Sequence, residues 1–297
     1  MNRLKKSKMT KKDRLQSTDK KPKVAKREQL QLQNNKVEEN DNMLTFGGHL
    51  EVFRQMLFRI LGVAGLIAVI IFCFKDITWN ILMAPSEWDF CTYRWIEQVI
   101  QALDIDFHFN EFHVDMIATD LSSQFMTHIT TSVYLGVLGA SPYILYELFR
   151  FISPALYENE RKYSVRVAGI IYVLFLLGVF LSYFVLFPIS FRFLGTYSVS
   201  AKVVSNITLD SYISTFVSLT LVMGVVFQLP VIAFFLGKLG FVNSKLLAHY
   251  RKHSFIVIMF VAAIITPPDL MTLILVTIPL YLLYEVSIRI VKLIEPH

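Results

Sequence analysis

Two apolar stretches of the chain contain no charged side chain at all. Val167–Phe191 and Ser211–Gly237 have 25 and 27 residues and include no Asp, Glu, Lys or Arg. A helix needs about 20 apolar residues to cross the hydrocarbon core of a bilayer, so each stretch is long enough to span a membrane. The whole chain, with 54% hydrophobic and 18% charged residues, is also too apolar for one ordinary soluble core. The sequence therefore predicts an integral membrane protein.

Weaker apolar stretches raise the predicted number of spanning helices to six. Two of them precede the charge-free pair, and the second carries Gly136, Gly139 and Pro142, which neighbouring helices can accommodate in a membrane. The predicted fold is an all-α integral membrane protein in which residues 44–297 form a six-helix domain and the last two helices are short. The expected spans are 56–76, 122–147, 164–190, 210–237, 253–267 and 270–288.

The last two apolar stretches form a predicted helical hairpin. Ser254–Pro268 and Leu270–Tyr284 have 15 residues each. That length gives about 22 Å of helix against about 30 Å of hydrocarbon, so either the bilayer thins locally or these helices do not cross it completely. Between them lies TPPD, residues 266–269, in which the two prolines end one helix and Asp269 caps the next.

Lys and Arg are concentrated in alternate segments of the chain. Loops rich in Lys and Arg stay in the cytoplasm, so the distribution predicts that both termini are cytoplasmic and that residues 77–120 lie outside. The predicted cytoplasmic segments 1–59, 148–166, 238–252 and 289–297 hold 25 of the 29 Lys and Arg, whereas 75–125 and 188–208 hold two each.

Residues 1–43 are rich in Lys, nearly lack aromatic side chains and show no apolar periodicity. A segment of this composition cannot bury enough apolar surface to fold, so it is predicted to be a disordered basic cytoplasmic extension. A solvated tail that helps to set the topology and touches anionic lipid accounts for it, and no nucleic-acid partner is expected.

The first outer segment, 75–125, carries nine acidic and two basic residues. Within it, RWIEQVIQAL places Trp95, Val99 and Leu103 on one apolar stripe at helical spacing, with Ile96 and Ile100 beside them. This pattern predicts an amphipathic helix that either lies on the membrane surface or roofs the helix bundle.

No catalytic constellation is present in the sequence. It contains no P-loop, no HExxH, no pair of CxxC motifs and no GxSxG, so no enzyme activity, catalytic residue, cofactor or metal site is predicted. The unusual residues are Glu147, Gln228 and Glu285, which lie at membrane depth, where polar groups normally face a partner, a cavity or water. A secondary transporter or channel for a small solute would also use such residues, but the chain shows no inverted repeat.

Several short motifs together resemble one family. HLEVFRQML precedes the first span, MIATD precedes the second, and SPYILYELFRFISPALYENERKY crosses the first cytoplasmic loop. YFVLFP, GVVFQLPV, ITPPD and IPLYLLYE follow in order. From about His49 to Val291 the sequence is similar to the TatC family, the polytopic receptor subunit of the twin-arginine protein translocase.

The resemblance implies a cup-shaped bundle in the cytoplasmic (inner) membrane of a bacterium. It implies binding of the twin-arginine signal peptides of folded proteins, assembly with single-span partners of the TatA and TatB type, and use of the proton-motive force without a nucleotide. An oligomer is expected.

The resemblance also places a signal-peptide site on the cytoplasmic face. Glu160 can accept the bidentate hydrogen bonds of an arginine, and Phe151 and Leu156 offer apolar surface to the peptide. The charged run ENERK can instead be a solvated loop in which Glu160 pairs with Arg161 or Arg166. The residues predicted for the site are Glu51, Arg54, Phe151, Leu156, Glu160 and Arg161, and those predicted to shape loops are Pro85, Pro142 and Pro154.

The sequence departs from the family pattern at two positions. Val52 stands where the family commonly has a Glu, and the nearest acid, Glu51, is rotated by about 100° on a helix. Gln228 replaces the membrane-embedded Glu of the fourth span, which removes a proton relay there. In the last hairpin, Thr266 and Glu285 fall where the family docks its single-span partners, although Glu285 can instead reach the water at the membrane surface.

Overall fold

The computed structural model describes residues 48, 50–103, 111–112, 114–152, 161–198, 200, 206–266 and 268–295, without the side chains of 152 and 161–166. The chain divides into two compact units, Met1–Arg59 and Ile60–His297. The predicted extension 1–43 lies outside the described residues. In the first unit, the described residues form the beginning of a helix that runs from Leu50 to Cys73.

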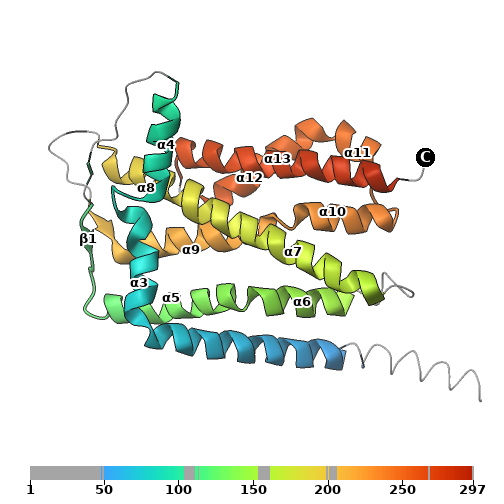
Figure 1. The fold of residues 1–297 in the computed structure, drawn as a ribbon, viewed down its shortest axis with the longest axis horizontal. Coiled ribbons are helices and arrows are strands. Elements are labelled where there is room, and N and C mark those ends of the chain that lie inside the picture. The colour runs from blue at the N-terminus through green and yellow to red at the C-terminus, as the bar shows by residue number, and fades with distance from the viewer. Residues whose placement is uncertain are drawn as a thin grey trace, which may run out of the picture. The chain divides into compact units, whose positions relative to one another are not determined.

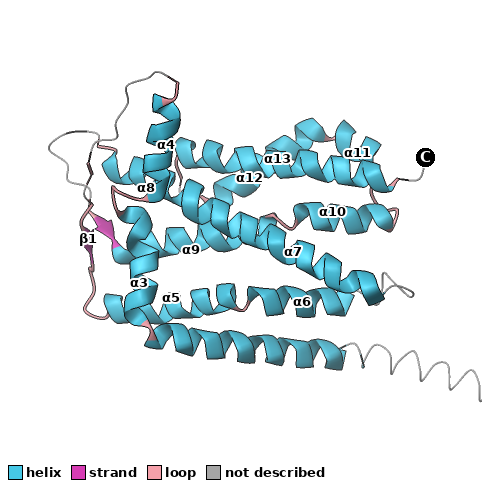
Figure 2. Cartoon of the chain, viewed as in Figure 1, coloured by secondary structure: helices cyan, strands magenta, loops and turns pink. Residues whose placement is uncertain are grey.

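All six predicted spans are helical, which confirms the all-α fold (Figure 2). In the described part of the chain, four helical stretches are long and apolar enough to cross a membrane: Leu50–Cys73, Val167–Thr196, Leu209–Lys238 and Leu270–Ile294. After the first span, the spanning elements are α5 (Ser123–Gly139), α6 (Ser141–Ile152), α7 (Arg161–Leu181), the π-helical segment η3 (Ser182–Leu186), α8 (Phe187–Thr196), α9 (Leu209–Val226), α10 (Leu229–Lys238), α12 (Arg251–Ile265) and α13 (Leu270–Ile294).

Prolines explain where the spans are interrupted. Proline has no backbone N–H, so it is tolerated in the first turn of a helix and breaks a hydrogen bond elsewhere. Pro142, Pro188 and Pro230 are each the second residue of a helix, namely α6, α8 and α10. The second predicted span is therefore divided at Ala140, and the fourth is divided at Phe227 and Gln228.

Short elements cover one end of the bundle formed by residues 60–297. They are α3 (Lys75–Met83), the 3-10 turn η1 (Ala84–Ser86), α4 (Cys91–Gln101), and the strands β1 (Met116–Ile117) and β2 (Ile207–Thr208), which pair in parallel. In Figure 1, α3 and α4 lie across the direction of the spanning helices at the same end as β1. The other end carries the short helix α11 (Ser244–His249).

Helix α4 is attached to the bundle around Pro188. Because Pro188 has no N–H, it cannot donate to the carbonyl of Phe184 four residues earlier, and the hydroxyl of Thr92 donates to that carbonyl instead. The Tyr93 hydroxyl donates to the carbonyl of Pro188 at 2.8 Å and lies 3.3 Å from that of Pro85. Both side chains are buried, and burial raises the pKa of Tyr93. Pro85 is buried as the second residue of the 3-10 turn η1.

The predicted amphipathic helix is present, but its apolar stripe does not cover the bundle. Trp95 is 63% exposed, and Val99 and Leu103 are exposed as well. Helix α4 instead contacts the rest of the protein through Thr92 and Tyr93, which lie on another face. The structure therefore does not support the alternative in which this stripe roofs the bundle.

The core lies where α7, η3 and α9 pack together. Aromatic rings meet edge to face, with 5.0 Å between the ring centroids of Phe187 and Phe216 and between those of Phe191 and Tyr212. Helices α7 and α9 approach closely at a glycine, because a Cβ on Gly178 would lie 2.5 Å from the carbonyl oxygen of Met223. The fully buried residues Leu219, Met223 and Val276 extend the core toward α13.

The last hairpin corrects one prediction. Helix α12 has 15 residues and is short as expected, but α13 has 25 residues and continues to Ile294, beyond the predicted end at 288. The charges at Arg289 and Lys292 suggested an earlier end; both are exposed, whereas Val291 between them is buried against Gly237. The predicted cap is confirmed, since the Asp269 carboxylate accepts from the Thr272 N–H at 2.7 Å.

The far end of α13 is held to α11. The Glu295 carboxylate accepts hydrogen bonds from the hydroxyl of Ser244, at 2.6 Å, and from its backbone N–H. These bonds hold the pKa of Glu295 below its usual value.

The bond from Thr92 to Phe184 leads to a testable prediction. Thr92→Val keeps the shape of the side chain but leaves a buried carbonyl without a donor, so it should lower the free energy of unfolding by about 1–3 kcal/mol. Pro188→Ala supplies a backbone N–H to the same carbonyl, so Thr92→Val should have a clearly smaller effect in that background. Unfolding of the purified variants in detergent would measure the effect of Thr92→Val in each background. An equal loss of stability in the two backgrounds would contradict the role assigned to the Thr92 hydroxyl at Pro188.

Candidate functional site

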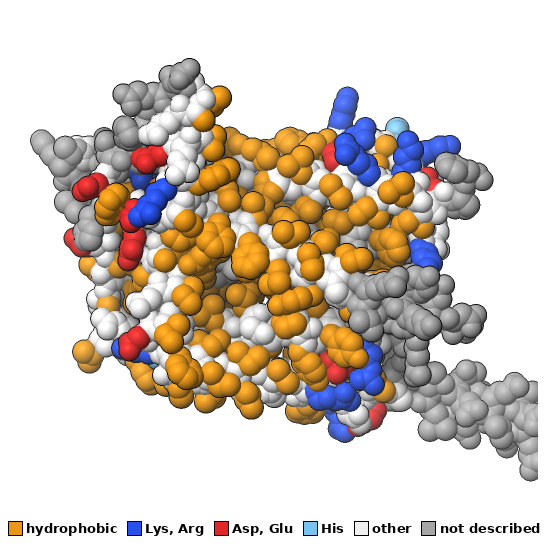
Figure 3. All heavy atoms as spheres, in the orientation of Figure 1, with side chains coloured by type: hydrophobic (Ala, Val, Ile, Leu, Met, Phe, Trp, Pro, Cys, Tyr) orange, Lys and Arg blue, Asp and Glu red, His pale blue; other side chains and the backbone are white. Residues whose placement is uncertain are grey.

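The two ends of the bundle differ in charge. Figure 3 shows a broad hydrophobic surface with Lys and Arg gathered mainly at the end that carries α11 and the C-terminus, and Asp and Glu mainly at the end that carries α3 and α4.

The predicted recognition loop joins α6 to α7. Pro154, Leu156 and Glu160 lie outside the described residues, as does the side chain of Arg161, which begins α7. Phe151 is half-buried near the end of α6.

Glu147 is the buried carboxylate nearest to this loop among the described residues. Its side chain is only 7% exposed, and its Oε1 lies 3.1 Å from the Tyr143 hydroxyl and 3.9 Å from Nη1 of Arg150. A buried carboxylate is retained only where donors or cations compensate for its lost hydration. The sequence indicated Glu147 as a polar residue at membrane depth, but did not include it in the recognition site.

The two site residues predicted in the first unit contact each other. Nη2 of Arg54 lies 2.8 Å from Oε1 of Glu51, and the Gln55 amide donates to the same oxygen at 3.1 Å. All three side chains are exposed on the N-terminal helix. An exposed pair one helical turn apart contributes only a few tenths of a kcal/mol, roughly, so both groups can exchange this contact for another partner.

Gln228 lies at the break between α9 and α10 and connects it to α7. Its Nε2 donates to the carbonyl of Ile171 at 3.1 Å, while its Oε1 is buried and has no partner among the described residues. A second polar contact joins the same helical stretches, since the hydroxyls of Ser182 and Thr220 lie 3.3 Å apart and are buried. This hydroxyl pair was missed in the sequence, because Ser and Thr are common in membrane helices and carry no distinctive spacing.

Thr266 and Glu285, the predicted docking residues, are both engaged within the protein. The buried Thr266 hydroxyl donates to the carbonyl of Ala262 at 3.0 Å. Glu285 forms a bidentate ion pair with Arg251, whose Nε lies 2.8 Å from Oε1 and whose Nη2 lies 3.0 Å from Oε2. The Tyr281 hydroxyl also donates to Oε1, at 3.2 Å. Glu285 thus connects α12 to α13. The sequence indicated Glu285 but not its partner Arg251, which lies far from it in the chain.

The described part of the chain contains no group of three or more His, Cys, Asp or Glu side chains that could hold a metal ion. Its two cysteines, Cys73 and Cys91, are exposed thiols and form no disulfide.

Comparison with known proteins gives a consistent match along the chain. The family model described as "Sec-independent protein translocase protein (TatC)" matches residues 48–279. A protein with that description from Blattabacterium sp. subsp. Periplaneta americana is 32% identical over 253 residues, covering 84% of this chain and 95% of that protein. One from Carboxydothermus hydrogenoformans is 32% identical over 260 residues, covering 86% and 96%. The solved structure described as "Crystal Structure of Twin Arginine Translocase Receptor- TatC" has a TM-score of 0.66 and 29% identity, and covers 83% of this chain and 99% of that chain.

The bond of Gln228 predicts a measurable effect on stability. Gln228→Leu removes the donor to the Ile171 carbonyl and should lower the free energy of unfolding by about 1 kcal/mol. Val225→Leu, at an exposed position of α9, is the control and should leave stability unchanged. Unfolding in detergent measures both variants. If Gln228→Leu were as stable as the wild type, the hydrogen bond from Gln228 would contribute nothing to stability.

A double-mutant cycle tests the bridge between α12 and α13. Arg251→Met and Glu285→Gln should each destabilise the protein, and the double variant should lose less than the sum, with a coupling free energy of roughly 0.5–1 kcal/mol. Lys252→Met, next in the chain and also exposed, should show no coupling to Glu285→Gln. Strict additivity of Arg251→Met and Glu285→Gln would exclude the pair as a bridge.

Proposed function

Because the chain belongs to the TatC family of Sec-independent protein translocase proteins, we propose that it is the receptor subunit of a twin-arginine translocase, which binds the signal peptides of folded proteins. The family transports proteins and is not enzymatic, as the sequence predicted. The proposal concerns the finer role of this chain within that transport.

One observation carries the proposal most strongly. The solved structure described as a twin-arginine translocase receptor is similar to this chain over 99% of its own length, at 29% identity. A second feature supports it, since the segment 153–160, which contains Glu160, begins only a few residues after the buried carboxylate of Glu147. The first observation supports the receptor role, and the second supports a peptide site at this end of the bundle.

Recognition of adjacent arginines needs carboxylates, because a guanidinium pairs with a carboxylate through two parallel hydrogen bonds. In this proposal Glu160 provides that contact, and Phe151 and Leu156 contact the apolar part of the signal peptide. Glu147 has a different role, because it is already bonded to Tyr143 and lies near Arg150; these contacts connect side chains of α6 just before the loop. Glu51 and Arg54, exposed on the N-terminal helix, are further candidates for contact with the peptide.

The orientation of the chain in the membrane is also a proposal. Arg150, Lys238 and Lys292 lie near the ends of α6, α10 and α13, whereas α3 and α4 carry the acidic residues Asp76 and Glu97. Under the positive-inside rule this distribution supports cytoplasmic termini and a cytoplasmic recognition loop.

Single-span partners of the TatA and TatB type are proposed to dock at the last hairpin. Helix α12 is too short to cross a bilayer alone and presents Ile256, Phe260 and Ile264 on one face, all more than 60% exposed. A partner helix in the membrane would cover this face. The carboxylate of Glu285 is held by Arg251, so its contribution to docking would be to position α12 against α13. Transport would draw on the proton-motive force and use an oligomer of the chain.

The proposal predicts that Glu160 selects arginine. Glu160→Gln keeps the shape and length of the side chain but loses its charge, so binding of a twin-arginine peptide should weaken by roughly ten- to a hundredfold. The preference over a twin-lysine peptide should disappear. Cross-linking of both peptides to the purified protein measures this.

Glu158→Gln is the matched control and should behave like the wild type, with equal amounts of both variants in the membrane. If the two variants behave alike, the loop is only a solvated connection, and Glu51 becomes the next candidate for the recognition carboxylate. Equal retention of the twin-arginine and twin-lysine peptides by the wild type would instead favour the rival function, a transporter or channel for a small solute.

A further inference from the structure

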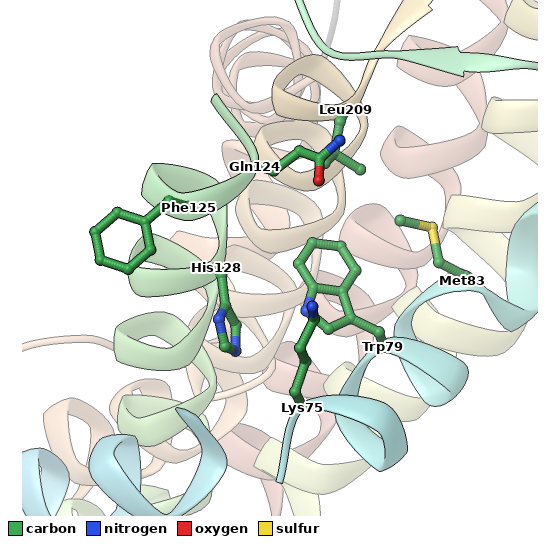
Figure 4. A pocket seen from close by; sticks show the side chains of 7 residues that line it. All are labelled: Lys75, Trp79, Met83, Gln124, Phe125, His128 and Leu209. Carbon is green, nitrogen blue, oxygen red and sulfur yellow. The ribbon is translucent and has the colours of Figure 1, made fainter. Parts of the chain in front are cut away.

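A cavity of about 400 Å³ lies at the acidic end of the bundle, away from the proposed peptide site. It is formed where α3 meets the first turns of α5 and α9, and so lies at the ends of apolar helices, where a bilayer gives way to water. Figure 4 shows the side chains that line it: Lys75, Trp79, Met83, Gln124, Phe125, His128 and Leu209.

Two nitrogen atoms in this lining have no partner. Nε1 of Trp79 and Nε2 of His128 are buried and make no hydrogen bond with any described residue. In Figure 4 the two rings are neighbours in the lining of the cavity, with 6.3 Å between their centroids and 52° between their planes. The His128 ring is held in place by stacking on Phe72 at 4.3 Å. The indole N–H of Trp79 can only donate, and Nε2 of His128 donates in the tautomer that carries its proton there, so the cavity is suited to a ligand that accepts hydrogen bonds.

The charge of the lining favours an anion. Lys75 lies one helical turn before Trp79 on α3 and makes no ion pair with any described residue, whereas Arg94, the other cation of the segment, is paired with Asp89 at 2.6 Å. None of the lining residues is acidic. Gln124 adds an amide from the first turn of α5, where the helix dipole is positive.

We propose that this cavity binds a phosphate group, and that the phosphate belongs to the headgroup of a phospholipid. An indole N–H, an imidazole N–H and an ammonium group can together bind the oxygens of a phosphodiester. The same cavity is lined by Met83, Leu209 and Phe125, whose ring is 57% exposed, so the apolar part of a lipid can continue from the phosphate along the protein surface. A purely apolar ligand would leave both nitrogens unpaired. Free phosphate would satisfy them but would leave the apolar lining uncovered.

The test is a lipid titration of the delipidated protein, followed by native mass spectrometry. The probes are phosphatidylglycerol, phosphatidylcholine, diacylglycerol, which has the same chains without phosphate, and inorganic phosphate. The wild type should bind both phospholipids at least tenfold more tightly than diacylglycerol. The double variant Trp79→Phe/His128→Phe keeps the two rings and removes both nitrogens, so it should bind the phospholipids about tenfold more weakly.

A matched control has the same two substitutions at exposed positions. Trp88→Phe/His249→Phe should bind lipid like the wild type. Lys75→Gln, at an exposed position, should weaken phosphatidylglycerol binding even if the double variant does not fold. Equal binding of diacylglycerol and phospholipid, or unchanged binding by both the double variant and Lys75→Gln, would overturn the phosphate site. Displacement of the lipid by inorganic phosphate at equal concentration would overturn the lipid as its source.

Discussion

The structure depends on one constraint, the need to pair every backbone N–H and C=O inside the protein where no water is available. Helices meet this need by themselves except where a proline lacks the N–H, and Pro142, Pro188 and Pro230 each remove such a donor from a span. At Pro188 the missing N–H is replaced by the hydroxyl of Thr92 from helix α4. The attachment of α4 to the bundle is thus a consequence of a proline within a spanning helix, and not a separate feature.

The same principle explains where the functional candidates lie. Gln228 sits at the second helix break and donates to a carbonyl of α7, so a polar residue at membrane depth serves first to join two helices. Glu285 joins α12 to α13 through Arg251 in the same way. Glu147, bonded to Tyr143, lies just before the loop proposed to bind the signal peptide. Gln228 and Glu285, which join helices of the bundle, also position the surfaces around them that are proposed to bind other molecules.

The two ends of the bundle are suited to different ligands. The Lys- and Arg-rich end contains the proposed peptide site, where carboxylates such as Glu160 would select arginine. The opposite end has an acidic surface but contains a cavity with Lys75, Trp79 and His128 and no acidic side chain. In both places the ligand proposed has the charge opposite to that of the groups it would contact. Local pairing, rather than the net charge of each end, therefore decides what can bind.

The sequence by itself determined the six apolar helices, the cap at Asp269, the amphipathic pattern of α4 and the family, because each rests on residues close together in the chain. It placed the end of α13 too early, since exposed charges hid the buried Val291 between them. The partners of Gln228, Glu285 and Thr92 are 57, 34 and 92 residues away, so no local pattern could reveal them. The unpaired nitrogens of Trp79 and His128 come from different helices as well. Only the tertiary structure decided these contacts, because hydrogen bonds between helices depend on how the helices pack, whereas membrane insertion depends mainly on the hydrophobicity of each segment.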